Sequence, residues 1–210
     1  MSLPDSPTQP TALAPSADGA ALGDGPARDA LHEALRQLDV ADAYQGRARA
    51  IVMCEALTGV AQALAGLHAY GPSEHHLAQA LRWAAQLGGC DLVADLHCAW
   101  AEVATNAGDL ADARDDSAGC AAARDRARDH AFEAARLARR ATDPNWELCL
   151  VLRASDVLER CGDHDDAMQL QQRALQLMGM AGSDPAGADE DFAAALPAGT
   201  VAQSAPGALM

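Results

Sequence analysis

Apolar residues recur every three to four positions along the middle of the chain, between about residues 27 and 178. This period places them on one face of an α-helix, whereas a half-buried strand would alternate apolar and polar residues. No segment shows that alternation, so the pattern predicts helix throughout. The expected helices span roughly 27–38, 47–70, 73–87, 91–107, 110–141, 144–161 and 164–178.

Glycine and proline mark the expected helix ends. Gly71-Pro72-Ser73 should end the second helix and cap the third, because proline cannot continue a helix and a serine hydroxyl accepts from unpaired amides. Further ends are expected at Gly88-Gly89, Gly108-Asp109 and Gly162-Asp163. The long fifth helix is either one rod or is broken near 117–119.

The two ends of the chain have a different composition. Residues 1–26 hold five prolines and three acids, and residues 179–210 hold three prolines, five glycines and four acids, with no basic residue in either stretch. Such segments cannot bury enough apolar surface to offset the entropy of ordering. The sequence therefore predicts disordered tails, 1–26 and 179–210, around one folded domain, 27–178.

Composition narrows the class of partner. Half of the 210 residues are hydrophobic, chiefly Ala and Leu, and the net charge is −15 with no lysine. That charge argues against nucleic acid and against anionic membranes as partners. No signal peptide and no apolar stretch near the twenty residues of a membrane span are seen, so a cytoplasmic protein is expected. The six cysteines are interpreted as small core residues of a reduced protein.

Small residues repeat with fixed gaps of twelve and seven positions. A small residue on the first helix of a pair, with two on one face of the second, lets antiparallel backbones approach closely. The three triads are Gly66, Ala78 and Ala85; Ala101, Ala113 and Cys120; and Ser155, Ala167 and Ala174.

This pattern resembles the tetratricopeptide repeat family. The best unit is 146–178, with its Gly162-Asp163 turn, and the resemblance covers about 48–178. It implies a short right-handed α-solenoid of about three antiparallel helix pairs, preceded by an N-terminal capping helix. The first and second units begin 35 residues apart, near the family period of about 34, but the second and third begin 54 apart. An insert at about 114–130 is therefore expected, and Ala131 and Ala138 compete with Ala113 and Cys120 as the small pair.

Catalytic and metal-binding motifs are missing, so a non-catalytic protein without a cofactor is expected. Cys90, His97 and Cys98, with His75-His76 upstream, do not have the paired spacing of a zinc site. The acids at 163–166 lack the rest of a calcium loop and are interpreted as helix capping. The arginines at 124–140 alternate with acids at helical spacing, as in intrahelical ion pairs on a solvated face.

The family resemblance implies a ligand-binding concave surface formed by the first helix of each pair. Four acids and one arginine among its residues favour a basic or apolar partner protein or peptide. We therefore expect a bacterial-type interaction module or scaffold, accessory to a signalling or regulatory protein. There are two alternative functions: a self-associating structural protein, such as a homodimer, and a hidden enzyme or metal protein. The acidic surface could also be an ordinary solvated helix face that binds nothing. The implied groove residues are Asp95, Cys98, Glu102, Thr105, Asn106, Cys149, Leu152, Asp156, Glu159 and Arg160.

Overall fold

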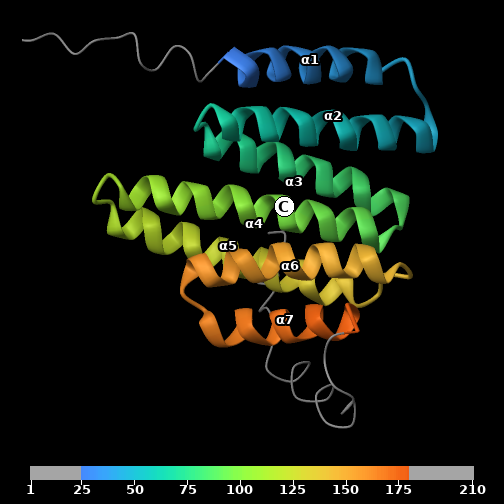
Figure 1. The fold of residues 1–210 in the computed structure, drawn as a ribbon. Helices are drawn as coiled ribbons and strands as arrows, with labels where there is room; N and C mark the ends of the chain where they lie inside the picture. Colours follow the sequence, from blue (N-terminus) through green and yellow to red (C-terminus); the bar gives the residue numbers. More distant parts are fainter. Residues whose placement is uncertain (1–24, 180–210) are drawn as a thin grey trace, which may run out of the picture. The chain divides into compact units, whose positions relative to one another are not determined.

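The computed structural model describes residues 25–179, and the predictions for residues 1–24 and 180–210 lie outside this range. Residues 25 and 26, assigned above to a tail, belong to the first helix. Over the described range the chain forms helices and no strand, so the all-α prediction is confirmed (Figure 1). The helices are α1 Gly25–Ala41, α2 Gly46–Gly66, α3 Tyr70–Leu87, α4 Cys90–Asp112, α5 Ser117–Ala138, α6 Pro144–Cys161 and α7 His164–Leu177.

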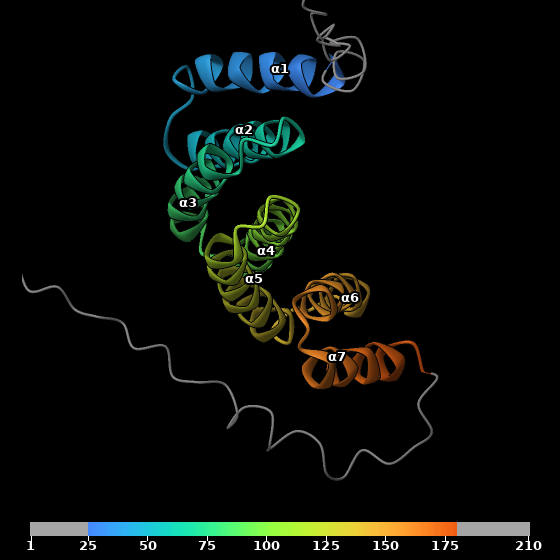
Figure 2. The same ribbon diagram turned by 90° about the vertical axis from the view of Figure 1, so that its left-hand side faces the viewer.

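The chain divides into two compact units after Leu87. Unit 1 contains α1 to α3, and unit 2 contains α4 to α7. Within each unit, consecutive helices are joined by short turns and pack antiparallel (Figures 1 and 2). The solenoid arrangement of the whole chain stays a prediction.

In unit 1, α2 packs between α1 and α3. A Cβ built on Gly59 would lie 3.2 Å from the Cβ of Ala34, and one on Gly66 would lie 3.2 Å from that of Ala27. These glycines therefore let α1 approach α2 closely. Gly66 faces α1 and not α3, and Ala85 of α3 is exposed. The first predicted triad therefore does not form the expected contact between α2 and α3.

The turn between α2 and α3 lies earlier than predicted. α2 ends at Gly66, where His68 adopts a positive φ of 58°, and α3 already begins at Tyr70. Pro72 thus lies in the first turn of α3, where a missing amide hydrogen costs nothing because the first amides of a helix have no intrahelical acceptor. Ser73 is buried, and its hydroxyl donates across the pair to the Ala61 carbonyl at 2.7 Å instead of capping.

α2 comes closer to a membrane span than the sequence interpretation allowed. Its 21 residues have a mean hydropathy of 1.3 over the most apolar window, so by length and composition alone it could cross a membrane. Within unit 1, α2 packs against both α1 and α3. Of the residues in that window, 39% are buried inside the protein.

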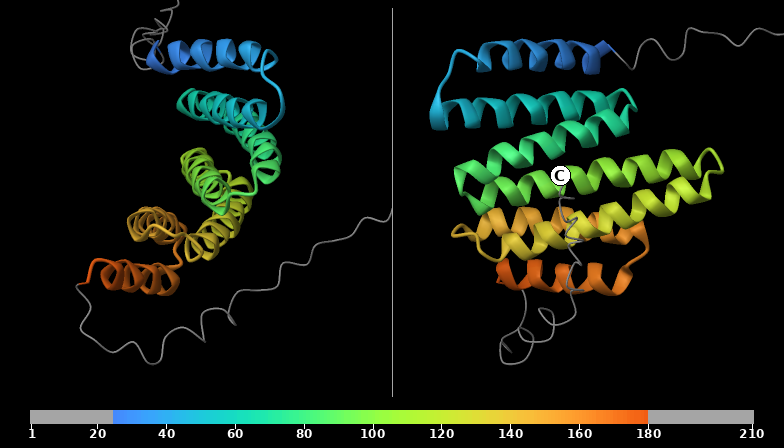
Figure 3. Two further views of the ribbon diagram at one scale, coloured as in Figure 1. Left: turned by 90° about the vertical axis from the view of Figure 1, so that its right-hand side faces the viewer. Right: turned by 180° about the vertical axis from the view of Figure 1, so that it is seen from behind.

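In unit 2, α4 and α5 form the longest hairpin of the described residues, with 23 and 22 residues. The predicted turn at Gly108-Asp109 is wrong, because Gly108 is buried inside α4 and the helix continues to Asp112. The turn follows at 113–116 and interrupts the helix predicted over 110–141, just before the residues 117–119 where a break was considered. The predicted insert, 114–130, therefore forms most of this turn and the first part of α5, which is continuous. The closed end of the α4–α5 hairpin extends beyond α6 and α7 (Figures 1 and 3).

The longer α4 changes which small residues meet. Ala113 caps the end of α4 and is exposed, so the second predicted triad is wrong at this position. Ala131 and Ala138, the competing pair, are both fully buried. Alanines on α5 allow close packing against α4 and α6 and belong to the core of unit 2.

α6 and α7 follow the sequence prediction closely. The Asp143 carboxylate accepts from the Asn145 amide at 2.9 Å to cap α6, and Gly162 ends the helix with a φ of 88°. Ser155, Ala167 and Ala174 of the third triad are all buried, and the Ser155 hydroxyl donates to the Ala167 carbonyl at 3.2 Å. The third triad therefore lies in the packed interior of this pair.

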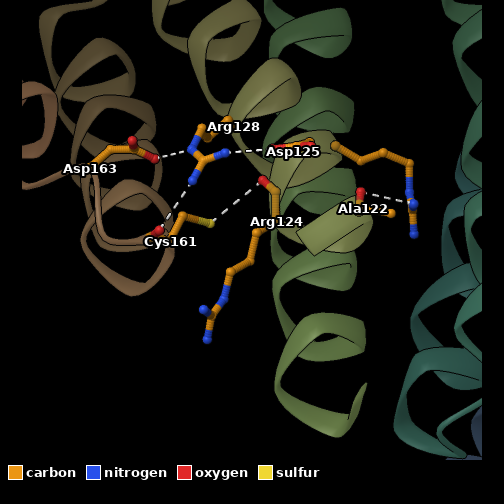
Figure 4. Close-up of polar contacts among 7 residues, drawn as sticks. Ala122, Arg124, Asp125, Arg128, Cys161 and Asp163 are labelled. Carbon is orange, nitrogen blue, oxygen red and sulfur yellow. Dashed lines mark hydrogen bonds and ion pairs between the residues drawn. The ribbon is translucent and has the colours of Figure 1, made fainter. Parts of the chain in front are cut away.

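Arg128 of α5 fixes the α6–α7 turn (Figure 4). Its guanidinium forms an ion pair with Asp163, a second with Asp125 at 2.6 Å, and a hydrogen bond to the Cys161 carbonyl at 3.4 Å. The hydrogen bond to Asp163 raises the pKa of Arg128. Asp163, which was predicted to act only at the start of a helix, thus also connects the α6–α7 turn to α5.

Candidate protein-interaction face

The predicted groove residues come from α4 and α6, which contact each other within unit 2. The structure brings most of them onto one side of this helix pair, which we call the α4–α6 face. Hydrogen bonds between the two helices connect residues 51 to 58 positions apart in sequence. The face is formed by Asp95, Glu102, Asn106 and Asp109 of α4 with Cys149, Leu152, Arg153, Asp156, Glu159 and Arg160 of α6.

Arg153 is the central charged residue of this face. Its Nη1 lies 2.5 Å from Asp95 Oδ1 and its Nε lies 2.7 Å from Glu102 Oε1, so one guanidinium joins two carboxylates of α4. Burial alone would lower the pKa of Arg153, but hydrogen bonds to Glu102 and Asp95 raise it above its ordinary value. The guanidinium stays charged and holds α6 on α4.

The sequence analysis missed Arg153, although helical spacing could have found it. Residues 149, 153, 156 and 160 are separated by four, three and four positions and so share one face of α6. The predicted negative field therefore needs correction, because two of its four acids are paired with an arginine that was not counted.

Arg160 forms a second bridge near the other end of α6. Its Nη2 donates to Asn106 Oδ1 at 2.9 Å and lies 2.5 Å from Asp109 Oδ2. This arginine is exposed, so the bridge orders surface side chains more than it stabilises the fold.

Cys98 and Thr105 lie inside the unit and not on the face. Each is only 1% exposed. The Cys98 thiol donates to the Leu150 carbonyl at 3.8 Å, and burial raises its pKa to about 12. The Thr105 hydroxyl donates to the Ala101 carbonyl at 2.8 Å. Neither side chain can contact a partner, because both are turned toward the core.

The outer stripe of the face belongs to α6 alone. Leu152 is 46% exposed, and Cys149, Asp156 and Glu159 are also exposed. A Glu159 oxygen lies 3.1 Å from His164 Nδ1, a pair that carries opposite charges only when the histidine is protonated. Two uncharged side chains, Cys149 and Leu152, are therefore followed by two acids along one exposed side of α6, next to the two arginine bridges.

Replacing Arg153 by methionine, which keeps most of the aliphatic stem, should lower the free energy of unfolding by about 1–2 kcal/mol. Two partly exposed carboxylates would lose a charged hydrogen-bond donor, an effect that solvent screening keeps moderate. Urea denaturation followed by circular dichroism measures the loss. Arg160→Met is the matched control and should cost below about 1 kcal/mol; equal losses would contradict the central role of Arg153.

A depression in unit 1 and the possible metal ligands were also considered as sites, and neither shows a network of charged side chains like that of the α4–α6 face. An open depression of about 480 Å³ lies between α1 and α2, lined mostly by small residues such as Ala30 and Gly59. Its only acid, Glu33, is paired with Arg36. Among residues 25–179, no cluster of three or more His, Cys, Asp or Glu side chains could hold a metal ion.

No protein-family model matches the chain, and comparisons with curated proteins and with solved structures give no match. The tetratricopeptide resemblance therefore depends on the residues that carry it and stays a prediction.

Proposed function

We propose that this protein is a protein-interaction module that binds a basic segment with a large apolar side chain on the α4–α6 face. The observation that carries the proposal is the α6 stripe, where Leu152 is 46% exposed and the exposed acids Asp156 and Glu159 follow it along the same side of the helix. An exposed leucine gains from burial against a partner, and neighbouring carboxylates select positive charge.

The arginine bridges support this use of the face. Asp95, Glu102 and Arg153 already hold one another before any partner arrives. Binding beside such ordered side chains loses less conformational entropy than binding on mobile ones. The tetratricopeptide resemblance would place the same residues on a concave surface, and an accessory role beside a signalling or regulatory protein fits such a module.

A peptide-display selection against the full chain tests the proposal. Selected peptides should be enriched in Arg or Lys next to Leu, Ile, Phe or Trp, and their binding should weaken with added salt. The variant with Leu152→Glu and Asp156→Lys should weaken binding at least about tenfold, because it removes the apolar contact and reverses a nearby charge. Fluorescence anisotropy of labelled peptides measures the dissociation constants.

Leu175→Glu on α7 is the matched control, since Leu175 is 44% exposed and lies outside the face. Selected peptides that bind the Leu152 and Asp156 variant as tightly as the parent chain would refute the proposed site. Met168 of α7 and Met178, which follows the helix, are also exposed. A mass that rises with concentration and is lowered by Leu175→Glu alone would instead favour self-association through α7.

A further inference from the structure

Two histidines meet between the helices of the α4–α5 hairpin. His97 of α4 and His130 of α5 lie with their Nδ1 atoms 2.8 Å apart, at hydrogen-bond distance. The indole of Trp100 is stacked on the His130 ring, with centroids 4.2 Å apart and planes inclined by 21°. Both imidazoles are only partly exposed. This pair belongs to neither the α4–α6 face nor the Arg128 contact.

The hydrogen bond between the rings depends on their protonation. A neutral imidazole has one donor and one acceptor nitrogen, so two neutral rings, or one neutral and one charged ring, can share a proton between the Nδ1 atoms. Two charged rings are both donors at every nitrogen. Full protonation therefore replaces the hydrogen bond with two like charges at close range.

The surrounding groups do little to compensate those charges. Glu133 favours protonation of both rings, but its two oxygens are hydrogen-bonded to Arg136 at 2.5 and 2.8 Å. Arg136 opposes a charge on His97, and Arg126 opposes one on His130. The stacked indole face of Trp100 attracts a cation. Burial, the largest cause, nevertheless lowers the pKa of both histidines.

We propose that the His97–His130 pair is an acid-sensitive lock between α4 and α5. At neutral pH the shared proton joins the two helices. As the pH falls, uptake of the second proton breaks this link and favours opening of the hairpin.

The sign of the pH effect follows from burial. Burial lowers the pKa of His130 to about 4 and also lowers that of His97, below the ordinary value of 6.5. The unfolded chain therefore binds protons first, and the contribution to stability is present above pH 6.5 and is lost as the pH falls toward 4. For His130 alone, the unfolding equilibrium constant should rise about thirtyfold between pH 8 and pH 5.

Urea denaturation of the full chain at pH 8 and pH 5 tests the lock. The variant with His97→Gln and His130→Gln keeps polar side chains but cannot take up these protons. The test compares the ratio of the unfolding equilibrium constant at pH 5 to that at pH 8. This ratio should be at least about thirtyfold smaller in the double variant than in the parent chain. His32→Gln, at an exposed site on α1, should leave the ratio unchanged. An equal pH ratio in the parent chain and the double variant would overturn the proposal.

Nuclear magnetic resonance of the parent chain tests the same idea without substitutions, should the double variant fail to fold. The His130 ring signals should titrate well below pH 6.5, the ordinary pKa of histidine. Ordinary titration of both His97 and His130 in the folded protein would overturn the lock.

Discussion

Replacing Leu158 by alanine should lower the free energy of unfolding by about 2–5 kcal/mol, the usual cost of leaving a cavity at a fully buried leucine. Leu158 is 0% exposed and belongs to the core that joins α4, α5, α6 and α7. This core is rich in alanine, whose methyl group is too short to move into the space. Urea denaturation followed by circular dichroism measures the change.

Leu152→Ala provides the control for that substitution on the same helix. Leu152 is 46% exposed, so its loss should change stability by no more than about 0.5 kcal/mol. Similar losses in the two variants would mean that α6 is rotated from the orientation described above, and the α4–α6 face would then be wrong as well.

Replacing Ala167 by leucine should lower the free energy of unfolding by about 1–3 kcal/mol, because overpacking forces side chains or backbone to move. Ala167 is 0% exposed, and its carbonyl accepts the Ser155 hydroxyl, so α7 lies close to α6 at this point. Thermal and urea denaturation of the full chain check the prediction.

Gln172→Leu introduces the same side chain at an exposed position of α7 and should be nearly neutral. If Ala167→Leu were equally neutral, the contact would have room for a larger side chain. The fixed gaps of twelve and seven would then lose their physical basis in the α6–α7 pair.

The sequence predicted the helices well where capping signals and packing needs agree. Gly162 ends α6 because its positive φ suits glycine, and the helix begins at Pro144 as expected. Gly108 shows the limit of such signals. It has no positive φ and lies in the buried interior of α4, where close contact with α5 opposes the expected break. Local glycine signals cannot reveal such tertiary contacts.

The contact between the two helices of the candidate site could be predicted, but the pairing of its charges could not. The family resemblance led to residues of α4 and α6, and these two helices do contact each other. Which acids are paired depends on distances across the two helices. Arg153 reaches Asp95, 58 positions earlier, and no one-dimensional pattern reveals that bridge. Likewise, the depth of Cys98 and Thr105 depends on how α4 is rotated against its neighbours.

The closed end of the α4–α5 hairpin offers a place to extend the molecule. Ala113, Arg114, Asp115 and Asp116 are exposed, and Asp115 has a positive φ of 59°. Exposed tips of this kind tolerate inserted sequence, because lengthening them disturbs little packing. A fluorescent domain or epitope joined through flexible linkers between Arg114 and Asp115 would therefore report on the protein in cells without occupying the α4–α6 face.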